Sequence, residues 1–341
     1  MSLVKLLRKI NKKSLFTTPS HNQKFFIFNK FRQLYKYDIS ETEAHNPQKA
    51  LSMAQNNAKR IYGTNYTYFL TNGSTSGIIA SVLTCTRKGD KVLIWDKAHI
   101  SHHNAVKLAG CEPVYYNIPI NEDWGVPDKI NIDLINVKGV KAVIVTSPTY
   151  EGITSDIKKI KEICSMNNAY LIVDEAHGAL YPFSDKLPKS SVNIADFTIQ
   201  SLHKTAGGLN PTALLHVNCD LDPLKFLAMI NTTSPSYPLL ASIEANINYL
   251  NSKKGRKKID DLISEINRIK NNINNIEFYG DDDTKILIKK NGMSGFDLSE
   301  KLYNEFNIED EITNEKSTML LCGIGTSEKM LKKLEYALKH I

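Results

Sequence analysis

The sequence predicts an α/β protein in which a large, mostly parallel sheet is followed by a smaller α+β unit. Between about residues 50 and 218, short apolar runs alternate with segments of helical pattern. These runs are almost continuously apolar, which is typical of parallel strands covered by helices on both faces. After residue 232 the chain becomes strongly helical, and from residue 284 strands and helices are mixed. A chain of 341 residues is long enough for both units.

The first unit supplies six strand candidates and three helices. The strands are expected at "KVLIW" (91–95), "EPVYY" (112–116), "KAVIVT" (141–146), "YLIVD" (170–174), "FTIQ" (197–200) and "ALLHV" (213–217). The helices are expected over 74–86, 101–109 and 155–167. Ser155 is the expected amino-terminal cap of the third helix, with Asp156 in its first turn.

The second unit is expected to contain strands and helices in alternation. The segments are strands over 284–289 and 317–323, and helices over 297–306 and 326–340. We therefore expect an amino-terminal arm over 1–48, a large domain over 49–235, and a connecting helix with a small carboxy-terminal domain over 236–341.

The first residues, "MSLVKLLRKINKK", place apolar side chains at helical spacing between lysines. The segment lacks the long apolar stretch of a secretory signal. A short amphipathic helix lying on the protein or on a partner subunit is expected, with surface targeting as the alternative.

Composition excludes several classes of function. Hydrophobic residues make up 42% of the chain, but no apolar run approaches the roughly 20 residues that cross a bilayer. The formal charge is +7, yet the lysines are scattered, and the densest cluster, "NSKKGRKK" (251–258), is typical of a solvated helix face. The five cysteines show neither CxxC pairing nor zinc spacing. We expect a cytoplasmic protein with no metal, nucleic-acid or membrane site.

Polar motifs follow several of the expected strands, where ligands bind in open α/β sheets. The motif "TNGSTSG" (71–77) precedes a helix, and the hydroxyls of Ser74, Thr75 and Ser76 with the free amides of a helix start attract phosphate. The motif "TSPTYEG" (146–152) ends another strand.

Asp174 and Lys204 also end predicted strands. Asp174 lies in "VDEAHG" (173–178), where a buried carboxylate needs a positive or proton-bearing partner. Lys204 follows in "SLHKTAGG" (201–208). A phosphate site, then an aspartate about a hundred residues on and a lysine about thirty residues later, is the pattern of fold type I enzymes, which have the aspartate aminotransferase fold and use pyridoxal 5'-phosphate.

Each part has a chemical role in that interpretation. Lys204 forms a Schiff base with the aldehyde, and Asp174 keeps the ring nitrogen protonated. Ala176 lies flat beneath the ring and His177 lies near the ring oxygen. Two further residues, Ser201 and His203, donate to the phosphate.

"DEAH" also occurs in nucleotide-dependent helicases, where it coordinates magnesium. That class needs an upstream Gly-rich loop ending in Gly-Lys-Ser/Thr, which is missing from the sequence.

The sequence resembles the bacterial ornithine/lysine/arginine decarboxylase family in its major, pyridoxal-phosphate-binding domain. The resemblance runs in family order over roughly residues 15–250. Its motifs are "FTTPSHNQ" (16–23), "YDISE" (37–41), "YFLTNGSTSG" (68–77), "KAHISHHNA" (97–105), "VTSPTYEG" (145–152), "LIVDEAHG" (171–178), "QSLHKT" (200–205) and "NTTSPSYPLLAS" (231–242).

The resemblance implies further roles. His99 matches the histidine that stacks on the cofactor ring and helps decarboxylation, and Ser74 to Ser76 match the phosphate cup. Thr232 matches a residue that reaches the phosphate of the neighbouring subunit, which implies a homodimer with shared active sites. A surface histidine cluster or adventitious metal site at "HISHH" (99–103), and a helix cap at Thr232, remain the alternatives.

The sequence departs from the family pattern at several positions. Ser20 and Asn22 replace a glycine and a lysine, and Asn210–Pro211 replaces a glutamine. Many members carry a further carboxy-terminal domain with a Pro-Pro-Gly-Ile-Pro segment, which this sequence does not contain. A compact variant, an altered specificity or dependence on another chain is expected from that difference.

The expected activity is decarboxylation of ornithine, lysine or arginine, with release of carbon dioxide and a polyamine-type amine. No arginine follows Arg268, and this favours decarboxylation over transamination, in which an arginine typically clamps the substrate carboxylate. Glu311, beside Glu309 and Asp310, is the candidate for binding the far end of a basic substrate, with a solvated loop as the alternative. An aldolase-like lyase or aminotransferase of the same fold and a non-catalytic regulatory relative also remain open.

Overall fold

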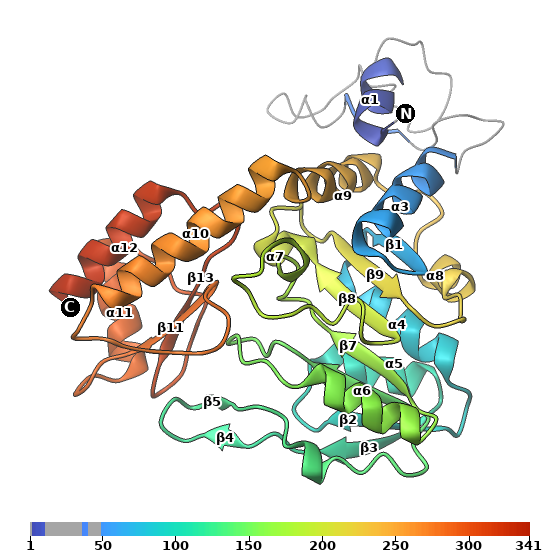
Figure 1. Ribbon diagram of the computed structural model, residues 1–341, viewed down its shortest axis with the longest axis horizontal. Helices are drawn as coiled ribbons and strands as arrows, with labels where there is room; N and C mark the ends of the chain where they lie inside the picture. Colours follow the sequence, from blue (N-terminus) through green and yellow to red (C-terminus); the bar gives the residue numbers. More distant parts are fainter. Residues whose placement is uncertain (1, 11–35, 40–48) are drawn as a thin grey trace.

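The computed structural model describes residues 2–10, 36–39 and 49–341. It contains a seven-stranded sheet and a four-stranded sheet, with two long helices running between them (Figure 1). The sequence motif over 16–23, with Ser20 and Asn22, lies outside the described residues, as does the end of the motif over 37–41.

The seven-stranded sheet, called the large sheet below, is mostly parallel. Its strands lie in the order β1 (Tyr66–Leu70), β9 (Ala213–Val217), β8 (Phe197–Ser201), β7 (Tyr170–Asp174), β6 (Ala142–Thr146), β2 (Lys91–Trp95) and β3 (Glu112–Tyr116). Only β9 runs against its neighbours in this sheet, pairing antiparallel with both β8 and β1. The predicted α/β class with a mostly parallel sheet is confirmed. Strand β1 was not predicted, although its sequence, "YTYFL", is rich in the aromatic and β-branched residues typical of strands.

Both faces of the large sheet are buried. Along β6, Ile144 faces one core, while Val143 and Val145 face the other. The first core is covered by α4 (Gly73–Cys85), α5 (Ile100–Leu108) and α8 (Leu224–Ile230), and the second by α6 (Ile157–Met166). Burial on both faces explains why these strands are continuously apolar in sequence.

The cap of α6 differs from the prediction. Asp156, not Ser155, is the N-cap, and its side chain accepts a hydrogen bond from the Lys159 amide at 3.1 Å. Ser155 instead accepts from the Ile130 amide at 3.0 Å, because the helix begins two residues later than Ser155.

The predicted amphipathic amino-terminal helix is present as α1 (Leu3–Ile10), and it lies on its own chain. Its buried leucines pack with α3 (Lys49–Tyr62) and α9 (Tyr237–Leu250). Figure 1 shows α1 at the top of the view, above α3. The Leu3 amide donates to Glu244 on α9 at 2.6 Å. The apolar spacing of the first residues therefore serves packing within the chain.

The four-stranded sheet, called the small sheet below, is antiparallel and follows the connecting helix α10 (Lys253–Asn271). Its core is formed with α10, α11 and α12. The elements are β10 (Glu277–Tyr279), β11 (Lys285–Lys289), β13 (Thr318–Leu321) and β12 (Ile312–Thr313), in that order across the sheet, with α11 (Gly295–Phe306) and α12 (Glu328–His340). The predicted strands and helices of this unit are confirmed, whereas the short β10 and β12 were not predicted.

A hairpin of the large unit reaches the small sheet. It consists of β4 (Ile120–Asn121) and β5 (Val126–Pro127), and Trp124 and Val126 pack with Leu287 and Met319 of the small sheet. Three further short elements are η2 (Ile132–Leu134), η3 (Tyr181–Phe183) and α7 (Leu202–Thr205).

Gly77 sets how closely α4 approaches the large sheet. A Cβ at this position would lie 2.8 Å from Leu70 Cδ1 and 3.1 Å from Ile199 Cγ2. The contact fixes the start of α4 against the ends of the strands.

We expect Gly77→Val to lower the free energy of unfolding by about 1–3 kcal/mol, because added side-chain volume overpacks this contact. Chemical denaturation would measure the loss. Gly325→Val is the control, since nothing lies within 4 Å of a Cβ at Gly325. Equal effects of the two substitutions would contradict the packing argument.

Candidate active site

A cavity of about 610 Å³ opens where β6, β7 and β8 end and α4 and α5 begin. Eight of the eleven sequence-predicted site residues line it, brought together from four separate segments of the chain. They are Ser74, Thr75, His99, Asp174, Ala176, His177, His203 and Lys204. Ser76, Ser201 and Thr232 lie outside its lining.

Lys204 lies in α7, the single helical turn directly after β8. Its Nζ is 2.9 Å from His177 Nε2. Burial lowers the pKa of the Lys204 amine; Asp174 acts against this shift, whereas the charge of Lys285 adds to it. A lowered pKa increases the fraction of neutral amine, which is the nucleophilic form.

Asp174 is buried at the end of β7 and bound by a histidine that the sequence analysis did not select. His102 Nε2 donates to Asp174 Oδ2 at 2.9 Å, and the Ala176 amide donates to Oδ1 at 3.1 Å. Burial alone would raise the pKa of Asp174, but the His102 hydrogen bond and the charges of His102 and Lys204 outweigh it, so the net pKa is lowered. Asp174 is therefore held as a carboxylate facing the cavity.

His177 contacts the candidate nucleophile directly. Its pKa lies well below the usual value because of burial and the nearby charges of Lys204 and Lys285. The ring is therefore neutral, and the Tyr150 ring packs edge-on against it with centroids 4.6 Å apart. Its backbone carbonyl accepts from Lys285 Nζ at 2.7 Å.

His99 is the N-cap of α5. Its Nδ1 accepts from the Ser101 amide at 3.3 Å and lies 2.8 Å from the Ser101 hydroxyl. With Nδ1 used as an acceptor, the neutral ring carries its proton on Nε2. Burial lowers the pKa of His99, which favours this neutral form.

The start of α4 offers amide donors to the cavity. Within the described chain, the N-cap Asn72 makes no side-chain capping bond, and first-turn amides such as those of Ser74 and Thr75 have no intrahelical partner by helix geometry. The Ser76 hydroxyl is occupied, because it donates to the Gly73 carbonyl at 2.8 Å. The Gly73 amide donates to the Pro211 carbonyl at 2.9 Å, so the departure at Asn210–Pro211 contacts the predicted phosphate site.

Ser201 and His203, the two predicted phosphate donors, differ in which of their side-chain atoms already have a hydrogen-bond partner. The Ser201 Oγ is fully buried and has no hydrogen-bond partner among the described residues. His203 Nδ1 donates to the Thr212 carbonyl at 3.0 Å, which leaves Nε2 as its free nitrogen. A buried hydroxyl without a partner is costly, and Ser201 lies outside the lining of the cavity.

These residues together fit pyridoxal phosphate. The amides of α4 suit its phosphate, and Asp174 suits a protonated ring nitrogen. Lys204 would bond to its aldehyde.

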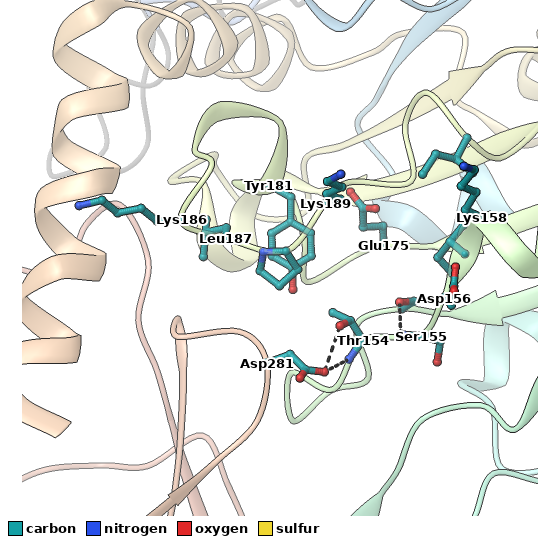
Figure 2. A pocket seen from close by; sticks show the side chains of 14 residues that line it. Thr154, Ser155, Asp156, Lys158, Glu175, Tyr181, Lys186, Leu187, Lys189 and Asp281 are labelled. Atoms are coloured by element: carbon teal, nitrogen blue, oxygen red, sulfur yellow. Dashed lines mark hydrogen bonds between the residues drawn. The ribbon is translucent and has the colours of Figure 1, made fainter. Parts of the chain in front are cut away.

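Glu175, which follows Asp174, and the predicted Thr232 lie outside this cavity. Glu175 points away from the cavity and accepts from Ser190, Ser191 and Gln200, while burial raises its pKa to about 7. It lines a separate cavity, seen in Figure 2. Thr232 is exposed, and its hydroxyl accepts from the Ser234 amide at 3.1 Å.

The acidic run on the small sheet divides into different roles. Asp310 accepts from Ser299, Thr313 and Thr318, which is a structural arrangement. Glu311 accepts from the Tyr150 hydroxyl, and Tyr150 lines the cavity. Glu309 is exposed.

The fold is that of the fold type I enzymes. Residues 12–286, more than half of the chain, match the family model described as Orn/Lys/Arg decarboxylase, major domain. The chain belongs to that family.

Several known proteins are similar to this chain. It is 28% identical to an uncharacterized protein, YaaO, from Bacillus subtilis (strain 168), over 92% of this chain and 72% of the relative. It is also 28% identical to an arginine decarboxylase from the same organism, over 96% and 74%. The constitutive lysine decarboxylase of E. coli superposes with a TM-score of 0.85 at 20% identity, covering 99% of this chain. Sphingomonas wittichii serine palmitoyltransferase superposes at 0.67 with 12% identity, over 99% of this chain and 82% of its own.

The chain spans 60% of the length of the E. coli lysine decarboxylase chain. Within the described residues, no helix is long and apolar enough to cross a membrane, and no group of three or more His, Cys, Asp or Glu residues is arranged to hold a metal ion.

His102 is the main site residue that the sequence analysis missed. It lies one helical turn after His99, so the spacing places both near the same end of α5. Its contact with Asp174 joins segments 72 residues apart, so no local pattern in the sequence indicates it.

We expect His102→Leu to lower the free energy of unfolding at pH 7 by about 3–5 kcal/mol, because it leaves Asp174 buried without its main donor. In the wild type, the lowered pKa of Asp174 gives stability that is present above the unfolded-state pKa and is lost as the pH falls through the folded-state value. The substitution raises that pKa.

The stability difference should therefore be largest at neutral pH and should shrink as the pH falls and the variant's Asp174 becomes protonated. Denaturant unfolding across a pH series would measure it. His103→Leu, the adjacent residue on α5 whose ring lies near Tyr115, is the control. A pH-independent difference would contradict the interaction.

Proposed function

We propose that the protein is a pyridoxal-phosphate-dependent decarboxylase of a basic amino acid, ornithine, lysine or arginine. The observation that carries this proposal is that Lys204 and Asp174 line one cavity together with His99 and the start of α4. Family membership supports the reaction class, and relatives named arginine, lysine and ornithine decarboxylase support the substrate class.

When bound, pyridoxal phosphate supplies an aldehyde that condenses with amines and a cationic ring that accepts the electron pair left by departing carbon dioxide. The Lys204 amine would hold the aldehyde until substrate replaces it. Asp174 would keep the proton on the ring nitrogen, and His102 keeps Asp174 in place. Lys204 or His99 would return a proton to the substrate carbon as general acid.

The cavity favours loss of the carboxylate over its retention. None of its described lining residues is an arginine, and Arg268 pairs with Glu265 and Glu335 on α10 and α12. A transaminase typically clamps the substrate carboxylate with a forked arginine. A weakly held carboxylate is the condition that decarboxylation needs.

Two carboxylates could receive the far end of a basic substrate. Glu151 lines the cavity, and burial raises its pKa. Glu311 reaches the same rim through its hydrogen bond with Tyr150. We assign the cationic end of the substrate to Glu311.

We also propose that the active form is a homodimer. Thr232 is exposed and is not among the residues that line the cavity of its own chain, a position from which it could serve a neighbouring subunit.

The first test is carbon dioxide release from a panel of amino acids by the protein loaded with pyridoxal phosphate. We expect release from a basic amino acid, and a loss of at least about a thousandfold in Lys204→Ala, because the nucleophile is removed. Formation of keto acids instead would indicate an aminotransferase. Cofactor binding without turnover of any panel member would contradict the proposal.

The second test concerns Glu311. We expect Glu311→Gln to raise the KM for the basic substrate about tenfold while kcat changes little, because a binding charge is lost and the chemistry is not. Glu309→Gln is the matched control, an exposed acid two residues away. Equal KM values in the two variants would remove Glu311 from substrate binding.

A further inference from the structure

The segment Asp281–Lys285, called the acidic segment below, joins the small sheet to two loops that carry cavity residues. The amides of Asp281 and Asp282 both donate to the Gly152 carbonyl at 3.2 Å. Thr154 donates to Asp281 through its amide at 2.9 Å and its hydroxyl at 3.0 Å, as the dashed lines in Figure 2 show. The acidic segment is therefore docked on the loop that carries Tyr150 and Glu151.

Lys285 is the buried centre of this contact. Its side chain is fully buried, and its Nζ donates to Asp282 Oδ2 at 2.6 Å, Thr284 Oγ1 at 3.0 Å and the His177 carbonyl at 2.7 Å. All three ammonium hydrogens are thus used. The Tyr181 hydroxyl donates to the same Asp282 oxygen at 2.7 Å.

The buried ion pair between Lys285 and Asp282 is hard to explain by stability alone. A fully buried ion pair pays a desolvation penalty that often equals its Coulomb attraction, so apolar residues would hold two units together as well. Lys285 of this pair also donates to the backbone carbonyl of His177, the residue whose ring contacts the Lys204 amine. This points to a role at the site.

We propose that Lys285 is a positioning residue for Lys204. Its ammonium group holds the His177 backbone, and with it the His177 ring that contacts the Lys204 amine. It also brings a buried positive charge into the surroundings of that amine. The proposal deepens the proposed function, since it rests on Lys204 as the reacting amine. It makes the small sheet a contributor to the chemistry of a lysine carried by the large sheet.

The electrostatics of the site agree with this role. The charged and titratable groups around Lys204 include Asp174 on β7, His177 after β7, His99 at the start of α5, Lys285 on β11 and Glu311 before β12. Burial and Lys285 lower the pKa of the Lys204 amine, whereas Asp174 and Glu311 act against the shift. Lys285 also lowers the pKa of His177.

The test is the pH dependence of Lys204 acylation by trace acetic anhydride, measured by mass spectrometry on the full chain without cofactor or substrate. We expect Lys285→Met to raise the labelling midpoint of Lys204 by about one pH unit, because a positive charge is lost and Asp282 is left uncompensated. At a fixed pH below the midpoint, labelling should therefore be about tenfold slower than in the wild type. Asp282→Asn should lower the midpoint. The double variant should lie between the wild type and Lys285→Met.

Lys270→Met is the matched control, because it breaks an ion pair with Asp283 of similar length, 2.7 Å, that does not contact His177. We expect its Lys204 midpoint to equal that of the wild type. The double variant replaces the buried pair by neutral groups, so it decides the matter if either single variant fails to fold.

The proposal would be overturned if Lys204 in both Lys285→Met and the double variant had the labelling midpoint of the wild type. It would also be overturned if the Lys270→Met control shifted that midpoint as much as Lys285→Met does. The readout needs no turnover, so it is independent of whether the protein decarboxylates any amino acid.

Discussion

The site depends on a negative charge held in the interior, the Asp174 carboxylate at the end of β7. Burying it is unfavourable unless donors surround it, and His102 and the Ala176 amide are those donors. This requirement fixes α5 against the large sheet, because His102 must reach Asp174 from the first turn of that helix. His99, three residues earlier, is then placed at the cavity by the same packing.

The two sheets contribute different properties to one cavity. The large sheet delivers Asp174 and Lys204 from the ends of adjacent parallel strands, an arrangement that follows from topology alone. The small sheet adds Glu311 through Tyr150 and the buried Lys285 through His177. Binding of the proposed cofactor would depend on the residues from the large sheet, whereas substrate choice and the acidity of the Lys204 amine would depend on those from the small sheet.

Local sequence signals were sufficient for six of the seven strands of the large sheet and for the polar groups at its edge. Strand β7 is apolar up to Asp174, and Lys204 follows directly after β8, so burial and position could both be inferred from order along the chain. The contacts of His102, Lys285 and Glu311 could not be inferred from the sequence, because each joins segments that lie from 72 to 161 residues apart. Lys285 in "TKILIK" also has the sequence pattern of an ordinary strand-edge lysine, and only its complete burial distinguishes it. The cap of α6 was missed by one residue because Ser155 and Asp156 are both good caps.

The helix α1 carries a practical consequence for handling the protein. Its leucines cover part of the surface of α9 and α3, and the Leu3 amide is tied to Glu244. Removing the residues up to Ile10 would expose that apolar surface and would leave Glu244 without the Leu3 amide as its donor. An exposed apolar surface promotes aggregation, and the resulting loss of activity could be mistaken for a property of the active site.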